Sequence, residues 1–295
     1  MMSEHRIAEI DRLYQNVRSY QSTKEFGELL QFIKRFRHIA PFNAMLLHVQ
    51  KPGSQFVTSA EDWWNQFGRT VKPGARPLII LQPFGPVAFV YEYNDTIGPP
   101  LPDYVVEPFQ TNLVISSNQL HSLINNIKAD GIGLYRHNYG TNIAGQIQWH
   151  SETEILTTAD GKYDVKSHFT IAYNENLTDT EVYTTILHEL GHLYCGHLCH
   201  NPKEEEWLPN RFNIGLTQEQ MEFEAETVSW LVCERLGIEN PSAQYLSDYL
   251  DDNDQIPAVS IDTILKATNT IESLVKQYKP PRKELILKKH EAVAR

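Results

Sequence analysis

The chain contains few cysteines and no long apolar stretch. Only three of its 295 residues are cysteine, an odd number without the spacing of a disulfide framework, so reduced thiols are expected. No apolar run approaches the roughly 20 residues of a membrane span, and the amino-terminal MMSEHRIAEIDR has none of a signal peptide's apolar core. These absences predict a cytoplasmic protein without a membrane partner. The length of 295 residues is sufficient for two modest domains.

Basic charge is also scarce, and it is unevenly distributed. The formal net charge is −11, yet residues 1–110 hold 11 basic and 11 acidic side chains, so the whole excess of acid lies in residues 111–295. An acidic surface repels phosphate, whereas a neutral one permits contact with it. The charge distribution therefore permits binding of nucleic acid by the amino-terminal part and disfavours it in the acidic remainder.

The most informative stretch is residues 178–198, TDTEVYTTILHELGHLYCGHL, which is predicted to be a helix begun by a capping box of Thr178 and Glu181. His188 and His192 lie one helical turn apart on one face, where two imidazoles can bind one metal ion. Glu189 lies beside them and can act as a base. This H-E-x-x-H spacing is typical of zinc peptidases. The alternative is a surface helix with two solvated histidines.

A catalytic zinc ion needs a third protein ligand. An extended motif ending in a third histidine is excluded, because Cys195 and Leu198 stand where it requires glycine and histidine. A short Cys/His zinc finger is a second possibility, but it would lack the usual C-x-x-C and H-x-x-x-H spacings of the ligands. Its ligands would be Cys195, His197, Cys199 and His200.

A downstream helix, predicted over residues 222–237, supplies a better candidate. Glu222 and Glu226 are four residues apart and share one side of it. We expect Glu222 to be the third ligand and Glu226 to orient a ligand histidine, although these roles could be exchanged. An ordinary acidic first turn, favoured by the helix dipole, is the alternative.

HELGH followed by EFEAETVS resembles the ImmA/IrrE metallopeptidase family, whose pattern is H-E-x-x-H and then E-x-x-A-[ND]-x-[FV]-A. The resemblance implies zinc held by His188, His192 and Glu222, with Glu189 catalytic. Glu226 departs from the family's Asn or Asp, and Ser229 departs from its Ala. The longer string EAETVSWLVCERLG is similar to the variant of this domain that is joined to an ArdC-type antirestriction domain. Together these similarities imply an α+β protein: a zincin-type domain with a small sheet, an HExxH helix and a Glu-bearing helix, preceded by a smaller α+β domain.

The segment from PFNAMLLHV through TSAEDWWNQFGRTVKPGARPLIIL is similar to the ArdC-type domain, which implies binding of single-stranded DNA. Basic residues interspersed with aromatic ones are consistent with this, since single-strand grooves combine positive charge with stacking rings. A solvated basic face over an aromatic core is equally open. The basic candidates are Lys34, Arg35, Arg37, Arg69, Lys72 and Arg76, and the neighbouring aromatic residues are Phe36, Trp63, Trp64 and Phe67.

The proline-rich and glycine-rich stretch at residues 99–106 predicts a domain boundary, giving an ArdC-like domain over 1–105, a metallopeptidase domain over 106–278 and a basic tail over 279–295. Helices are expected over 4–20, 23–38, 42–50, 116–129 and 260–278, and a hairpin from PLIIL and VAFVYEY. Strands are expected at GIGLYR, GQIQWH and SHFTIAYN. The last of these, Ser167 to Asn174, is the predicted edge strand that binds an extended substrate.

These patterns predict a zinc metalloendopeptidase acting on a specific intracellular protein, and the resemblance suggests a helix-turn-helix repressor in a stress, defence or mobile-element context. The alternative function is an antirestriction-type single-stranded-DNA-binding protein whose metal site is not proteolytic. The sequence does not choose an oxyanion-stabilising residue among Tyr173, Tyr194, His197 and Arg211.

Overall fold

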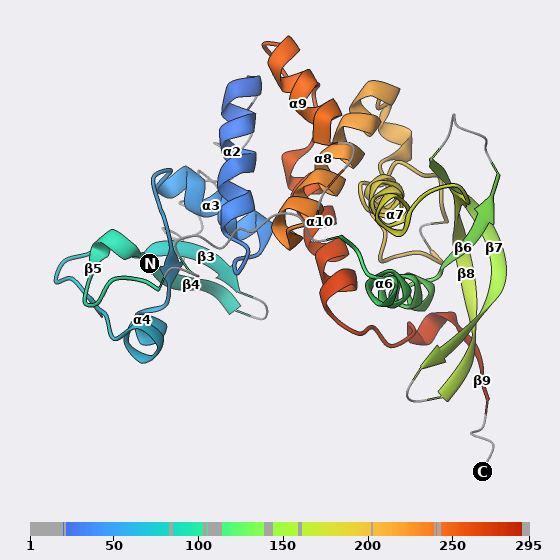
Figure 1. Cartoon of the computed structure of the whole chain (residues 1–295), viewed down its shortest axis with the longest axis horizontal. Coiled ribbons are helices and arrows are strands. Elements are labelled where there is room, and N and C mark those ends of the chain that lie inside the picture. Colours follow the sequence, from blue (N-terminus) through green and yellow to red (C-terminus); the bar gives the residue numbers. More distant parts are fainter. Residues whose placement is uncertain are drawn as a thin grey trace. The chain divides into compact units, whose positions relative to one another are not determined.

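The computed structural model describes residues 20, 22–82, 85–102, 105, 114–138, 144–158, 161–201, 203–238, 240 and 243–290 (Figure 1). It is a mixed α+β protein, as the sequence predicts. Apart from residue 20, the helix expected over 4–20 lies outside the described residues. None of the helices in the described ranges is both long and apolar enough to cross a bilayer.

The chain divides into two compact units. Residues 1–111 and 249–256 form the first unit, and residues 112–248 and 257–295 form the second. The sequence analysis assigned 249–256 to the metallopeptidase domain, but backbone pairing holds this segment in the first unit. The Thr23 amide donates to the Asp254 carbonyl at 3.2 Å, and Ser22 forms an isolated antiparallel bridge with Gln255.

The first unit combines helices with two small antiparallel pairings. The predicted hairpin is present as β3 (Leu78–Gln82) and β4 (Gly85–Glu92), with β1 (Val57–Thr58) on the other side of β4, and β2 (Thr70–Val71) pairs separately with β5 (Thr96–Ile97). Its helices are α2 (Thr23–Arg35), α3 (Pro41–Gln50) and α4 (Ala60–Phe67), and η1 (Tyr93–Asp95) is a short 3-10 turn. Ser22 and Ser59 cap α2 and α4, since their side chains accept hydrogen bonds from the backbone N–H groups of Glu25 and Asp62.

The second unit is built on a mixed sheet. Its central strand is β8 (Gly161–Asn174), which pairs antiparallel with β7 (Gly145–Thr158) along one edge. Along the other edge it pairs first with β9 (Ile286–His290) and then, in parallel, with β6 (Ile132–His137). Helices α6 (Ser117–Ala129) and α7 (Asp179–Tyr194) lie against one face of this sheet (Figure 1).

This topology corrects two expectations. Ser167 to Asn174 belongs to the central strand β8, so its backbone is paired with β7 on one edge and largely with β6 on the other, and it cannot receive a substrate strand. Within the predicted basic tail, the described residues 279–290 belong to the second unit. Residues 283–285 form η3 (Lys283–Leu285) and residues 286–290 form β9, since Leu285 (2% exposed) and half-buried Ile286 complete a small core with Val165 and Tyr163.

Three further helices complete the second unit. They are α8 (Gln218–Leu236), α9 (Ala243–Asp252), whose last residues lie in the first unit, and α10 (Ile261–Lys276); η2 (Phe212–Ile214) precedes α8. Helix α8 begins four residues before its predicted start, because Thr217 and Gln220 form a complete capping box. Glu222 therefore lies in the second turn, and an ordinary acidic first turn does not explain it.

Helix α8 is the centre of the second unit. It packs against both α7 and α10, and from Phe223 to Cys233 all its residues are buried. A helix enclosed in this way must find internal partners for its polar side chains. Glu224 and Glu226 are therefore constrained to pair with groups on neighbouring segments.

A close approach of α7 and α8 is expected to make Gly191 irreplaceable. A Cβ on Gly191 would lie 2.9 Å from the Ala225 carbonyl oxygen and 3.0 Å from its Cα, both main-chain atoms. Gly191→Ala should lower the free energy of unfolding by about 1–3 kcal/mol. In a helix with open space beside the glycine, the same substitution would raise the free energy of unfolding by roughly 0.5–1 kcal/mol. Urea unfolding followed by circular dichroism measures the sign. Gly53→Ala is the control, since nothing lies within 4 Å of its added Cβ, and a Gly191→Ala protein as stable as wild type would contradict this packing.

Candidate metal centre

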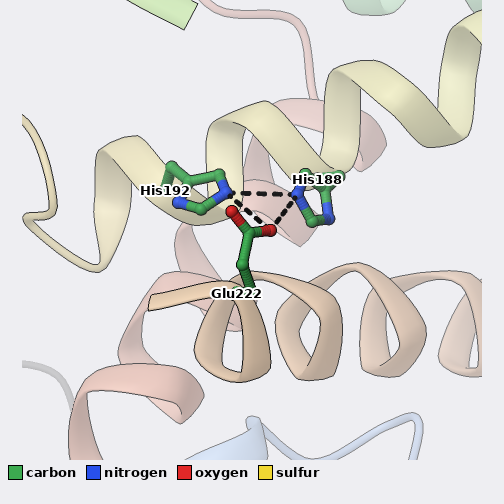
Figure 2. Close-up of side chains that lie close together, drawn as sticks. All are labelled: His188, His192 and Glu222. Carbon is green, nitrogen blue, oxygen red and sulfur yellow. Dashed lines mark hydrogen bonds and ion pairs between the residues drawn. The ribbon is translucent and has the colours of Figure 1, made fainter. Parts of the chain in front are cut away.

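Three potential ligand atoms converge between α7 and α8 (Figure 2). His188 Nε2 and His192 Nε2 lie 3.1 Å apart, and Glu222 Oε2 lies 3.4 Å from the first and 3.6 Å from the second. Ligand atoms at zinc distances of 2.0–2.2 Å in a tetrahedron are separated by about 3.4 Å. The separations and the donor set, two imidazoles and one carboxylate, therefore fit zinc.

Glu226 lies behind His188 and does not join these atoms. Its Oε2 is 2.9 Å from His188 Nδ1, the nitrogen opposite the one that faces Glu222. A carboxylate in this position fixes the ring orientation and makes the other nitrogen more basic. Burial lowers the pKa of His188, but the contacts with Glu222 and Glu226 outweigh it and raise the pKa to about 10. The same contacts with His188 and His192 hold the pKa of Glu222 well below its usual range.

Glu189 is held close to the two histidines by the edge of the sheet. Its Oε2 accepts a hydrogen bond of 2.9 Å from the backbone N–H of Ile147 on β7. Gly145 permits this approach, since a Cβ there would meet the Thr185 side chain of α7 and lie 3.1 Å from the Ala172 carbonyl oxygen. Burial raises the pKa of Glu189, and the neighbouring His188 and His192 oppose the rise. The result is an oriented carboxylate of increased basicity.

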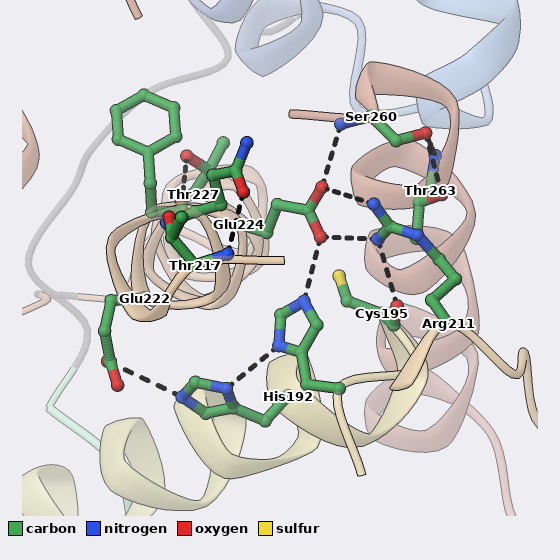
Figure 3. Close-up of polar contacts among 12 residues, drawn as sticks. His192, Cys195, Arg211, Thr217, Glu222, Glu224, Thr227, Ser260 and Thr263 are labelled. Carbon is green, nitrogen blue, oxygen red and sulfur yellow. Dashed lines mark hydrogen bonds and ion pairs between the residues drawn. The ribbon is translucent and has the colours of Figure 1, made fainter. Parts of the chain in front are cut away.

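Behind His192 lies a second set of polar groups (Figure 3). His192 Nδ1 is 2.9 Å from His197 Nδ1, and His197 Nε2 is 2.8 Å from Glu224 Oε2. Arg211 donates to both oxygens of Glu224, at 2.5 Å and 2.9 Å. Burial raises the pKa of Glu224, but these donors outweigh it and the pKa lies below normal.

The sequence pattern did not reveal this set. His197 and Arg211 were expected only as oxyanion or finger candidates, and Glu224 was not among the predicted site residues. The only signal in the sequence is the position of Glu224, two residues from Glu222, and its burial with the run from Phe223 to Cys233 is seen only in the structure.

Two other groups of potential ligands already have competing partners. Cys195, His197 and Glu224 are fully buried, and Arg211 already neutralises the carboxylate. In the third group, His168 contacts Glu205 directly, while Glu204 is paired with Lys166 at 3.0 Å. Among the described residues, no group of metal-ligating side chains includes Cys199 or His200, so the short finger is absent from this part of the chain.

The oxyanion candidates are committed to other contacts. Tyr194 donates to Asp130 and is buried, and Tyr173 accepts from Arg136 at 3.1 Å. His197 and Arg211 belong to the set around Glu224. The described contacts place none of these groups at the ligand atoms of His188, His192 and Glu222 as an oxyanion donor.

No protein-family model matches the chain, and no curated protein matches it. Two crystal structures match, the metal-free and Mn(II)-bound forms of antirestriction ArdC protein from R388 plasmid. The metal-free form is 15% identical over 79% of this chain and 81% of its own, with a TM-score of 0.34. The Mn(II)-bound form is 16% identical over 79% and 82%, with a TM-score of 0.38.

The basic residues of the first unit are of two kinds. Arg35, Lys72 and Arg76 are exposed, and Lys34 and Arg37 are half-buried. Arg69 is 5% exposed and was wrongly considered a DNA contact. Its Nε donates to Thr96 Oγ1 at 2.8 Å, and its guanidinium lies 4.3 Å from the Tyr93 ring centroid, so it supports the fold.

The aromatic residues divide in the same way. Phe36 and Trp63 are core residues, 1% and 0% exposed, because they fill the space between the helices and strands of the first unit. Trp64 is 62% exposed and could stack on a base. The interpretation as a basic face over an aromatic core therefore holds for Phe36 and Trp63 and leaves Trp64 as a candidate contact.

Removing the carboxylate ligand should abolish metal retention without unfolding the protein. For Glu222→Gln we expect zinc affinity to fall by more than the roughly 10–100-fold that loss of an outer hydrogen-bond partner costs. Zinc per chain is measured by mass spectrometry after purification without chelators or a His tag. Glu219→Gln, an exposed position on the same helix, is the control and should retain zinc. Equal zinc retention by both variants would remove Glu222 from the site.

Proposed function

We propose that the chain is a zinc-dependent metallopeptidase that hydrolyses a peptide bond in an intracellular protein. The observation that carries the proposal is the convergence of His188, His192 and Glu222 beside Glu189, a buried carboxylate that is not one of the three. A purely structural metal site has no need of such a group. The second unit supports a zincin-type arrangement, with an edge strand, an HExxH helix and a Glu-bearing helix.

In the proposed reaction, the metal ion and Glu189 have separate roles. A bound zinc ion would supply a Lewis acid that polarises the substrate carbonyl and lowers the pKa of a water molecule. Glu189, with its pKa raised by burial, accepts the proton of the attacking water and passes it to the leaving amine. The Ile147 N–H holds the carboxylate in place throughout.

The substrate is proposed to lie along β7. Within the described residues β7 pairs only with β8, so its other edge is unpaired in these ranges. The Ile147 N–H points from this edge to Glu189, so the edge runs beside the catalytic group. An extended segment could add there by main-chain hydrogen bonds. The resemblance to ImmA/IrrE suggests a helix-turn-helix repressor as the cytoplasmic substrate.

Glu189→Gln should separate metal binding from catalysis. The amide keeps the size of the side chain but cannot accept a proton, so we expect unchanged zinc content and a fall in cleavage rate of at least about 100-fold. Zinc-loaded protein is incubated with a peptide library made from a bacterial proteome, and new amino termini are counted by mass spectrometry. Glu206→Gln, an exposed carboxylate, is the matched control. Wild type and Glu189→Gln producing equal numbers of termini would contradict the peptidase.

A second candidate function, binding of single-stranded DNA by the first unit, is favoured by its exposed side chains. Arg35, Lys72 and Arg76 are exposed there, and Trp64 and Phe89 are 62% and 40% exposed. Cationic and aromatic groups together are what a single strand requires. Under this alternative the metal site is not proteolytic, and the protein acts as an antirestriction factor.

The DNA candidate predicts a salt-dependent loss of affinity in the double variant Arg35→Glu/Arg76→Glu. Affinity for a fluorescent oligo-dT should fall, and the slope of log affinity against log salt should decrease by about 0.7 for each phosphate that the variant no longer neutralises. Fluorescence anisotropy measures both. Lys203→Glu/Lys283→Glu makes the same change of charge in the second unit and should have little effect. Identical behaviour of the two double variants would eliminate Arg35 and Arg76 as DNA-binding residues.

A further inference from the structure

The end of α7 brings His197 back to a metal ligand. The His197 N–H donates to the His192 carbonyl at 3.1 Å, and the Gly196 N–H donates to the Leu193 carbonyl at 3.0 Å. These two hydrogen bonds are the pattern of a Schellman cap. Gly196 has φ +76°, and a Cβ there would lie 3.0 Å from the carbonyl carbon of Pro209. In this motif the two side chains that meet are usually apolar. Here they are His192 and His197.

The partners of Glu224 determine where the protons of His197 lie. An ionised carboxylate only accepts hydrogen bonds, and Glu224 receives them from both terminal nitrogens of Arg211 and from the Ser260 N–H at 2.8 Å. His197 Nε2, 2.8 Å from the same carboxylate, must therefore carry a proton. Arg211 already balances the charge of Glu224, so a neutral His197 completes the pocket and its Nδ1 has no proton.

The contact with His197 determines which nitrogen of His192 carries the proton. An unprotonated His197 Nδ1 can only accept, so the His192 nitrogen that faces it at 2.9 Å must be Nδ1–H. A neutral imidazole has one N–H. His192 Nε2 is then a free lone pair, and it is the atom that faces Glu222 and His188.

We propose that His197, held by Glu224 and Arg211, is a positioning residue that locks His192 in the tautomer able to bind the metal ion. This inference rests on the proposed metal centre and deepens it. The two ligand histidines are oriented in different ways: a carboxylate contacts His188 directly, whereas a second imidazole stands between His192 and its carboxylate. The arrangement is encoded locally in His192-Leu-Tyr-Cys-Gly196-His197 and completed by α8.

The test replaces the bridging ring. His197→Phe keeps a planar aromatic ring, slightly larger than imidazole, and removes both nitrogens, so His192 loses its acceptor. We expect zinc affinity, measured by competition with a chromogenic chelator, to fall by about 10–100-fold. His200→Phe removes a half-buried imidazole three residues away, whose Nδ1 lies 3.2 Å from the Leu198 carbonyl, and should leave the affinity unchanged. Thermal unfolding of the metal-free variants verifies that both are folded.

A spectroscopic measurement on the wild-type protein tests the tautomers of His192 and His197 even if a variant does not fold. In zinc-loaded protein with ¹⁵N-labelled histidine, two-bond ¹H–¹⁵N correlation spectra should show His192 protonated at Nδ1 and His197 protonated at Nε2. Wild type that binds zinc with His197 protonated at Nδ1, or a folded His197→Phe with wild-type affinity, would overturn the positioning role and leave the metal centre standing. Wild type that binds no zinc would overturn both proposals.

Discussion

The close approach of α7 and α8 at Gly191 and Ala225 is the constraint on which the site depends. Because Gly191 has no side chain, the backbone of α8 can lie within 3.0 Å of the position that a Cβ would occupy. At this separation Glu222 on α8 reaches His188 and His192 on α7. The three ligand atoms belong to two helices only, so their spacing is set by a single packing contact. Helix α7 also carries the fourth group, Glu189, and the sheet orients it, since the Ile147 N–H of β7 donates a hydrogen bond to its carboxylate.

Helix α8 carries three carboxylates at alternate positions, and each has a different partner. Glu222 faces both histidine Nε2 atoms, Glu226 contacts His188 from behind, and Glu224 holds His197 and Arg211. An ionised carboxylate inside a protein is costly unless it is paired. Burying Glu224 and Glu226 beside cations and N–H donors therefore links the stability of the second unit to the order of its site.

Local patterns predicted much of this structure. The capping box at Thr178, the helix over residues 116–129 and the i, i+4 spacing of His188 and His192 need only neighbouring residues, and all are present. The capping box at Thr217 follows the same rule, but the sequence analysis overlooked it and began α8 too late.

Pairing between distant segments could not be predicted in this way. The central position of β8 depends on parallel pairing with β6 across an intervening β7, and β9, which also pairs with β8, lies more than a hundred residues later. The place of 249–256 depends on backbone bonds to Ser22 and Thr23. The set around His197 combines two histidines, a buried glutamate and an arginine from a loop. Their distances in sequence, 13 and 27 residues between Glu224 and its side-chain partners Arg211 and His197, give no periodic signal.

The most direct test of the central claim is anomalous diffraction at the zinc edge from crystals of the zinc-loaded protein. We expect one strong peak in the second unit, bonded to His188 Nε2, His192 Nε2 and a Glu222 oxygen, with Glu189 close to it but not bonded. A peak at Cys195, His197 and Glu224, or at His168 and Glu205, would contradict it. So would a peak at which Glu189 replaces Glu222 as a ligand.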